Sequence, residues 1–337
     1  MRRIPVAAVA LVVVSCGGSG SRSNPAGPDP ARELQGQTVS AVDGSPMSEV
    51  TIQLGDRAAV PADGNGTFHI PVSGNGPYAA FISGVPVVRR HTMLSTAAAG
   101  AARVSLIPAS FDLKAFDEMF RTSNERLQRW TTPPSLVIVA NVMKYVPTTS
   151  ERFDARSEQM TDSEITLLQA HLTEGLALLT AGTYTSFASV EIERPSAGQS
   201  VVVQRPGKIV VGRYVGIADG TSEPIIGYGN WAERGDGAIV AGTIWLDRDF
   251  DKSETGRRLL RIHELGHALG YNHVSVRTSI MNPAIGPEPT DFDRGGAAIA
   301  FQRPVGNVSP DTDPTPGFGS STSQVVEGGT RWAAPIR

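Results

Sequence analysis

Residues 263–273 read HELGHALGYNH and place three of the chain's six histidines within a single short stretch. His263 and His267 are four residues apart, so on a helix their imidazoles project from one face about 6 Å apart and can reach one metal ion. Gly270 would end that helix, because glycine readily takes the positive φ that lets a chain turn back, and the turn would bring His273 round as a third ligand. The spacing therefore predicts a metal site made of three imidazoles.

Three neutral imidazoles suit a zinc ion and leave its fourth coordination position for water. Zinc lowers the pKa of such a water to about 7, which creates a nucleophile at physiological pH. Glu264 sits beside the histidine pair on the same helix, where it could take the proton of the water and pass it to a leaving amine. The expected chemistry is hydrolysis of a peptide bond at one zinc ion, with Glu264 as the general base.

The pattern HExxHxxGxxH, followed by the sequence SIMNP at residues 279–283, resembles the metzincin zinc peptidases and among them the matrixins most closely. In that family a methionine turn passes beneath the metal, and the resemblance places Met281 there. RLQRWTTPPSLVIV, GTIWLDRDF and DFDRGGAAIAFQRP resemble the entry to the first strand, the edge strand above the cleft and the last helix of the family. The resemblance implies an α/β metzincin-type domain with a twisted mixed sheet and two long helices.

The chain also departs from the pattern of the family. Trp245 stands where matrixins place one histidine of a second, structural zinc, so we expect no second zinc site. An inhibitory propeptide of the cysteine-switch type is excluded, because the one cysteine is Cys16. Some metzincins carry a tyrosine two residues after the methionine as an oxyanion helper. That position is Pro283 here, which leaves Tyr271 and Tyr228 as equal candidates.

The elements expected around the motif alternate between strands and helices, which indicates an α/β layer domain over residues 108–308. Strands are predicted near residues 135–141, 187–192, 208–217 and 238–246. Helices are predicted over residues 111–129, 161–180 and 254–269, the second of them opened by the capping residues from Thr161 to Glu164.

Residues 35–107 are predicted to be all-β. The run EVTIQLG alternates apolar and polar residues, as half-buried strands do, and turn sequences occur at DGSP (43–46) and DGNG (63–66). These features resemble the small β-sandwich of carboxypeptidase regulatory-like modules. Such a module spaces or docks a neighbouring domain, so the catalytic chemistry is expected outside it.

The start of the chain resembles the signal of a bacterial lipoprotein. Arg2 and Arg3 precede an apolar run from Ile4 to Val14, which is too short to span a bilayer, and VVSC then resembles a lipobox that ends in Cys16. We expect a signal peptide over residues 1–15, lipid on Cys16 and a flexible tether over residues 16–34. The protein would then be anchored at the bacterial cell envelope, outside the cytoplasm. An ordinary secretory signal with a chance cysteine is the alternative.

Two further segments carry weaker signals. Asp247, Asp249, Asp251 and Glu254 resemble a calcium loop, but the glycine of an EF-hand loop is missing, so helix capping is favoured over calcium. Residues 309–337 are rich in Gly, Pro, Ser and Thr, and this composition predicts a disordered tail.

Composition limits the partners. The chain has 337 residues and a net charge of −3, which gives no reason to expect nucleic acid. The sequence predicts a monomeric, lipid-anchored zinc metalloendopeptidase that acts on proteins or peptides, peptidoglycan crosslinks included. The alternative is a surface binding or adhesion protein with an inactive peptidase domain. The sequence leaves open whether the β-sandwich regulates activity.

Overall fold

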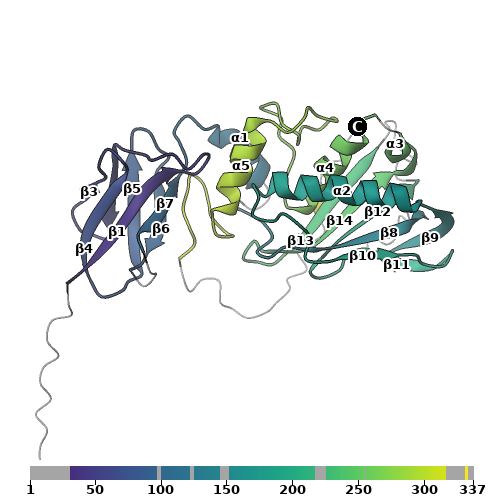
Figure 1. Cartoon of the computed structure of the whole chain (residues 1–337), viewed down its shortest axis with the longest axis horizontal. Helices are drawn as coiled ribbons and strands as arrows, with labels where there is room; N and C mark the ends of the chain where they lie inside the picture. Colours follow the sequence, from purple (N-terminus) through teal and green to yellow (C-terminus); the bar gives the residue numbers. More distant parts are fainter. Residues whose placement is uncertain are drawn as a thin grey trace, which may run out of the picture.

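The computed structural model describes residues 31–96, 100–121, 125–144, 152–216, 225–253, 255–315 and 331–332. Two units lie next to each other along the long axis of the molecule (Figure 1). The N-terminal β-unit, residues 31–107, consists of strands. The larger unit combines a wide sheet with helices, and it contains the histidines of the predicted metal site.

Two sheets form the N-terminal β-unit, with strand orders β4-β1-β7 and β3-β2-β5-β6. Alternate residues of its strands point into a shared apolar core, as in β4, where every second side chain is buried. The resemblance to a carboxypeptidase regulatory-like module stays a prediction. The strands are β1 (Ala31–Ser40), β2 (Val50–Leu54), β3 (Val60–Pro61), β4 (Thr67–Ser73), β5 (Tyr78–Gly84), β6 (Arg90–Leu94) and β7 (Ala102–Leu106).

The predicted end of the tether at residue 34 is wrong. Strand β1 already begins at Ala31 and pairs with β4 from Ala31↔Ser73 onward. Leu34 is buried in the core of the N-terminal β-unit, so these residues gain both a backbone ladder and apolar contacts. Composition alone did not reveal this, because the stretch before β1 is rich in Gly, Ser and Pro.

The larger unit is built on an eight-stranded mixed sheet with the order β11-β9-β8-β12-β14-β13-β15, and β10 pairs with β8. Strands β8, β12 and β14 are parallel neighbours, whereas β9 and β13 run antiparallel to them. The central strands are buried on both faces, which explains their continuous apolar sequences. The bounds are β8 (Ser135–Lys144), β9 (Arg152–Gln159), β10 (Val190–Glu193), β11 (Ser200–Val202), β12 (Lys208–Val215), β13 (Gly227–Glu233), β14 (Ile239–Asp247) and β15 (Arg331–Trp332).

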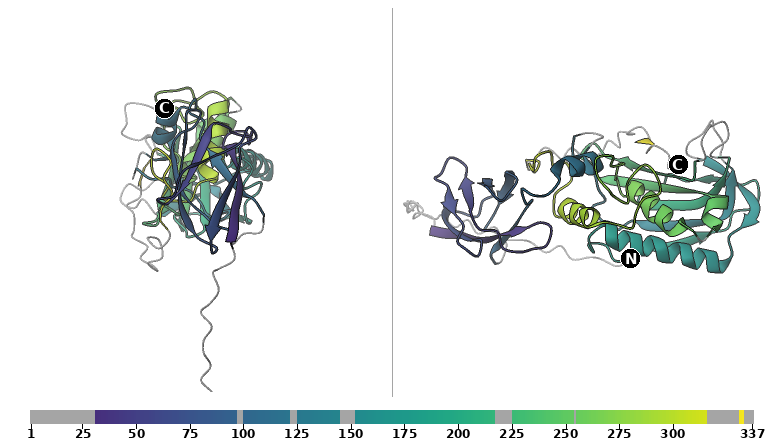
Figure 2. Two further views of the ribbon diagram at one scale, coloured as in Figure 1. Left: turned by 90° about the vertical axis from the view of Figure 1, so that its left-hand side faces the viewer. Right: turned by 90° about the horizontal axis from the view of Figure 1, so that it is seen from above.

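Two long helices, α2 (Asp162–Leu179) and α4 (Arg257–Ala268), pack against each other and against one face of the sheet (Figures 1 and 2). Helix α2 opens with the predicted capping box between Thr161 and Glu164. The other helices are α1 (Leu113–Phe120), α3 (Arg248–Lys252) and α5 (Asp291–Phe301). Among the described residues, no helix is long and apolar enough to cross a membrane.

Three predicted elements differ from the structure. The helix expected over residues 111–129 is the shorter α1, which ends at Phe120. The segment GTIWLDRDF was expected to contain the edge strand, but its strand β14 lies inside the sheet between β12 and β13. Strand β13, which was not predicted, runs beside α4 instead. Its sequence GYGNWAE has no clear apolar alternation, because two glycines face the helix. The helix expected from residue 254 begins at Arg257, and Glu254 lies outside the described residues.

The predicted disordered tail is wrong for its first residues and for Arg331 and Trp332, which pair with β13 as β15. Asp311 is fully buried, and its carboxylate accepts two hydrogen bonds of 2.7 Å from the guanidinium of Arg303. The same guanidinium donates to the hydroxyl and carbonyl oxygens of Ser105 in β7. Asp313 binds Arg90 of β6 at 2.8 Å. These residues join the larger unit to the N-terminal β-unit, which a count of Gly, Pro, Ser and Thr could not predict.

Candidate metal centre

Helix α4 carries two of the three histidines into the interior of the larger unit. Ile262, Leu265 and Leu269 pack into the main apolar core, between α2 and the sheet. Every residue of α4 from Leu260 to Ala268 is buried, so the helix is central and has no solvated face. Burial of this kind fixes the positions of His263 and His267, because a core helix cannot shift without disrupting its packing.

The chain turns back after α4 as the sequence predicts. Gly270 has a φ of +100°, a backbone conformation that favours glycine, and a side chain there would also collide with Ile239. Tyr271 N–H donates to the carbonyl of Gly266, and Asn272 N–H donates to the carbonyl of Met119 in α1. These bonds guide the chain round so that His273 faces the two helical histidines.

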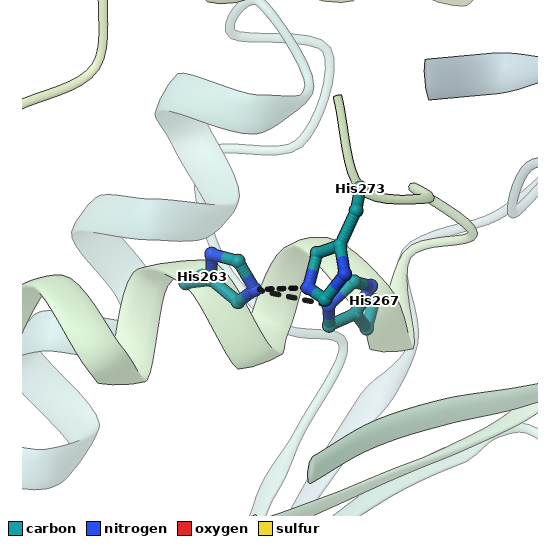
Figure 3. Close-up of side chains that lie close together, drawn as sticks. All are labelled: His263, His267 and His273. Carbon is teal, nitrogen blue, oxygen red and sulfur yellow. Dashed lines mark hydrogen bonds between the residues drawn. The ribbon is translucent and has the colours of Figure 1, made fainter. Parts of the chain in front are cut away.

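The three imidazole rings converge on one point (Figure 3). The Nε2 atoms lie 3.0 Å apart between His263 and His267, 3.1 Å between His267 and His273, and 3.2 Å between His263 and His273. Ligand atoms at 2.0–2.1 Å from a tetrahedral zinc would lie about 3.3 Å apart. The triangle of nitrogens therefore has the size that one zinc ion requires.

The protonation of the rings also fits a metal. His263 Nδ1–H donates to the carbonyl oxygen of Ile280 and His267 Nδ1–H to that of Tyr271, both at 2.6 Å. With the proton on Nδ1, the Nε2 atoms of these two rings are bare lone pairs that face each other at 3.0 Å. A cation between them turns this repulsive contact into a favourable one, and backbone acceptors on Nδ1 are the usual support of a histidine ligand.

Burial keeps the rings neutral. Removal from water lowers the pKa of His263 to about 3, with a further contribution from His273, and burial alone lowers the pKa of His273 to about 4. Burial likewise holds the pKa of His267 well below its ordinary value. All three imidazoles are therefore unprotonated at neutral pH, as metal ligands must be. Among the described residues, these histidines form the group that could hold a metal ion.

Glu264 lies on α4 between the two histidines and is completely buried. Neither of its carboxylate oxygens has a hydrogen-bond partner among the described residues, and burial raises its pKa well above the ordinary value. A buried carboxylate without a partner is costly, so this group points to a ligand or a metal that completes the site. The orphaned oxygens and the histidine triangle together fit a metal with a polar ligand of its own.

Strand β13 approaches α4 at the level of these residues. A Cβ atom on Gly229 would lie 2.4 Å from the carbonyl oxygen of Glu264 and 2.5 Å from Cβ of His267. A Cβ on Gly227 would lie 2.3 Å from a carboxylate oxygen of Glu264. Any side chain larger than hydrogen would push the strand away, so the two glycines set the depth of the site. The sequence did not lead us to these glycines, although residues two positions apart lie on the same face of a strand.

Met281 is fully buried and lies against α4. Its sulfur would be 2.5 Å from a Cβ atom on Gly266, which places the methionine directly beside the helix turn between the two histidines. The turn that carries it also supplies the Ile280 carbonyl for His263. The structure thus places Met281 beside the turn of α4 that carries Glu264 and two of the histidines.

The two tyrosines considered as oxyanion helpers do not face the site. The hydroxyl of Tyr271 donates to the carbonyl of Leu179 at the end of α2, and its ring packs on Phe120. Tyr228 alternates with Gly227 and Gly229 on β13, so it points to the opposite face of the sheet, where it packs on Trp245. This expectation is wrong for both residues, because α1 and α2 hold Tyr271 and strand alternation turns Tyr228 away from α4.

The face of the sheet turned away from α4 carries a cluster of aromatic side chains around Trp245, the residue that stands in place of a histidine of the second zinc site. Trp245 packs edge-on against Phe153 and Tyr228 and lies next to Tyr214. The Trp245 side chain is fully buried in this second apolar core of the larger unit.

The acidic loop after β14 caps helices and binds arginines. Asp247 accepts hydrogen bonds from the backbone N–H groups of Asp249 and Phe250, which is N-capping of α3. Asp251 is fully buried and binds Arg213 and Arg261, each at 2.7 Å. Capping was expected at the start of the long helix, but this is wrong for Asp251, which binds arginines, and the N-cap of α4 is Gly256 without a side-chain cap. Calcium was not favoured at this loop, and its fourth acid, Glu254, lies outside the described residues.

One family comparison covers the metal centre. Residues 183–294 match the family model of matrixin, a range that begins after α2 and includes the three histidines, Glu264 and Met281. A comparison with curated proteins gave no match. The mixed sheet and two long helices are compatible with an α/β metzincin fold. The match and the histidine cluster together support a metzincin-like metallopeptidase domain in this part of the chain.

Proposed function

We propose that the protein is a zinc-dependent metalloendopeptidase. The observation that carries this proposal is the pairing of a histidine triangle of zinc dimensions with Glu264, a fully buried carboxylate whose oxygens have no partner among the described residues. Three neutral imidazoles and an adjacent carboxylate are the donor set that hydrolytic zinc sites use. The matrixin match over the same residues supports the assignment.

His263, His267 and His273 would hold the zinc ion through Nε2. When bound, zinc supplies an acidified water and polarises the carbonyl of a peptide substrate. Glu264 then accepts the proton of the attacking water and donates it to the departing amine. The raised pKa of Glu264, caused by burial, suits this role, because a carboxylate with a higher pKa is a stronger base.

The experiment compares wild-type protein from residue 31 onward with Glu264→Gln and with a matched control, Glu174→Gln. Glu174 lies on α2 and pairs with Arg258 at the surface. Bound metal is measured by elemental analysis, and cleavage is measured with a mixed peptide library. We expect one zinc in all three proteins and a loss of cleavage of at least about a hundredfold in Glu264→Gln alone.

Other results would change the assignment. Protein that holds zinc but cleaves nothing in the wild type would favour the binding or adhesion function. Protein that binds no zinc would overturn the proposal. Equal cleavage by wild type and Glu264→Gln would remove Glu264 from the reaction.

We further propose that the protein is attached to the bacterial cell envelope through lipid on Cys16, facing away from the cytoplasm. Cys16 lies outside the described residues, and the support is the lipobox-like sequence alone. Mass spectrometry of the protein from a bacterial membrane fraction should find a lipid-modified N-terminal cysteine. Cys16→Ala should release the protein from that fraction, whereas attachment that survives this change would contradict the anchor.

A further inference from the structure

Four acidic side chains are fully buried in the described part of the chain: Asp251, Glu264, Asp293 and Asp311. Asp251 pairs with Arg213 and Arg261, and Asp311 pairs with Arg303. The ion pairs of the described residues include neither Glu264 nor Asp293. Buried charges are normally paired or placed next to a metal ion. Glu264 is accounted for by the proposed reaction, which leaves Asp293 without an explanation.

Asp293 binds the turn that carries Met281. One oxygen accepts the hydroxyl of Ser279, and the other accepts the backbone N–H of Ile280 at 3.1 Å. Ser279 Oγ in turn accepts the backbone N–H of Met281 at 2.9 Å. The carboxylate thus fixes three consecutive residues of the turn from the side of α5.

The same turn supports a proposed ligand. The carbonyl oxygen of Ile280 accepts the Nδ1–H of His263, so Ile280 is held by Asp293 at its nitrogen and holds His263 at its oxygen. Asp293 is therefore linked to the metal position through Ile280 and the imidazole of His263. A negative charge on this path also favours a cation at the far end, because charges in a low-dielectric interior interact strongly over several ångströms.

Helix capping explains only part of these contacts. Asp293 is the third residue of α5 and forms a capping box with Thr290, whose backbone N–H and hydroxyl both donate to the carboxylate. A negative charge is also favourable in the first turn of a helix. Neither effect requires the bonds to Ser279 and Ile280, which belong to a different segment.

We propose that Asp293 is a positioning residue of the metal centre: it fixes the Ser279–Met281 turn, and through Ile280 the ring of His263, and it supplies negative charge that favours the bound cation. This inference rests on the proposed function. It predicts that Asp293 acts on metal affinity and ligand geometry as well as on the stability of α5.

The test measures zinc affinity by competition with a chelator, the visible spectrum of the cobalt-substituted protein, and the melting temperature of the metal-free protein. Asp293→Asn is the main variant, since it keeps the shape and removes the charge. Asp291→Asn is its matched control, because Asp291 lies in the same first turn but is exposed. Thr290→Ala removes the cap of α5 and leaves the bonds to the turn in place.

We expect Asp293→Asn to weaken zinc binding by about 10- to 100-fold, the usual effect of removing an outer support of a ligand. Its cobalt spectrum should shift, because the ring of His263 is no longer held in one orientation. Asp291→Asn and Thr290→Ala should keep the wild-type zinc affinity and spectrum, although Thr290→Ala lowers the melting temperature. Ser279→Ala keeps the carboxylate and should weaken zinc by about threefold or more, which tests the path if Asp293→Asn fails to fold.

Two results would overturn the positioning role while the proposed function stands. One is zinc affinity and a cobalt spectrum unchanged in Asp293→Asn, or in Ser279→Ala if the former does not fold. The other is an equal loss of zinc affinity in Thr290→Ala, which would assign the effect to capping. A wild-type protein that binds no zinc would overturn both proposals.

Discussion

Burial sets the pKa values of the individual side chains at the candidate metal centre. Glu264 and the three histidines lie in an interior where ionised groups are disfavoured, so burial raises the pKa of the carboxyl and lowers the pKa of the imidazoles. Both shifts serve the proposed chemistry, because the histidines stay free to bind a metal and the carboxylate becomes a stronger base. The protonation states that the proposed reaction requires are therefore set by the burial of single residues.

This burial predicts how the metal-free protein responds to acid. A histidine whose pKa is lowered on folding binds protons more readily in the unfolded chain, so its contribution to stability is complete above the unfolded pKa of 6.5. That contribution is lost as the pH falls from about 6.5 toward the folded pKa values, about 4 for His273 and about 3 for His263. Glu264 acts in the opposite direction because its pKa is raised on folding, but three histidines outweigh one carboxyl, so the melting temperature of metal-free protein should fall between pH 7 and pH 4.

His273→Asn provides the comparison for this prediction. It removes one of the titrating groups, so its melting temperature should depend less steeply on pH over the same range. Identical slopes in the two metal-free proteins would contradict the assignment of the acid response to the histidines. Thermal melts by circular dichroism at several pH values are sufficient.

Contacts between α4, β13 and the turn before α5 define the shape of the site. Helix α4 brings two histidines, the turn before α5 brings Ile280 and Met281, and β13 closes the side at Glu264 through glycines. None of these elements forms the site alone. The contact between β13 and α4 is the closest of them, since hydrogen atoms on Gly227 and Gly229 occupy space in which a methyl group would collide with the helix.

Gly229→Ala should therefore disturb both folding and metal binding. The new methyl group would meet backbone and Cβ atoms of α4, which cannot rotate away, so we expect a loss of about 1–3 kcal/mol in the free energy of unfolding. Zinc affinity should fall in the same protein, because the displaced atoms belong to Glu264 and His267. Chemical denaturation and chelator competition measure the two effects.

Gly235→Ala is the control for this substitution. Gly235 lies in the turn between β13 and β14, and a Cβ atom there would meet nothing within 4 Å. Its unfolding free energy should stay within about 0.5 kcal/mol of the wild type. A Gly229→Ala protein as stable as this control would show that β13 can move away from α4 at little cost.

The two units of the molecule are joined by apolar contacts, in which Ala41 and Ile107 enter the core of the larger unit, and by buried polar contacts. Arg303 and Asp311 are both fully buried, and Arg303 reaches across to Ser105 of the N-terminal β-unit. The backbone of residues 311–313 pairs with β6, through His91 N–H to the carbonyl of Asp311 and Asp313 N–H to the carbonyl of His91. The segment that follows α5 thus contributes to fixing the N-terminal β-unit to the larger unit.

Asp311→Asn should loosen this interface. The substitution leaves the guanidinium of Arg303 buried without its charged partner, which costs about 3–5 kcal/mol in comparable buried pairs. Scanning calorimetry should show one transition for the wild type and a lower or divided transition for the variant. Asp56→Asn, an exposed residue in a turn of the N-terminal β-unit, is the control and should melt like the wild type.

An unchanged single transition in Asp311→Asn would mean that the interface contributes little to holding the two units together.

The position of the N-terminal β-unit bears on whether it regulates activity, which the sequence left open. In Figure 1 the N-terminal β-unit lies beyond α1 and α5 from the sheet that carries β13 and β14. Ser105 and His91 of the N-terminal β-unit contact the segment that follows α5.

The parts of the site that depend on short-range geometry can be predicted from the sequence. Helical spacing put His263, Glu264 and His267 on one helix, Gly270 permitted the turn, and the distance to Met281 fitted the resemblance, because each relation spans fewer than about ten residues of chain. Long-range packing sets the rest: β13 closes the site, Tyr228 and Tyr271 face away, and Asp293 and Asp311 are buried. These outcomes depend on which distant segments pack together, and local propensity and periodicity carry no information about that choice.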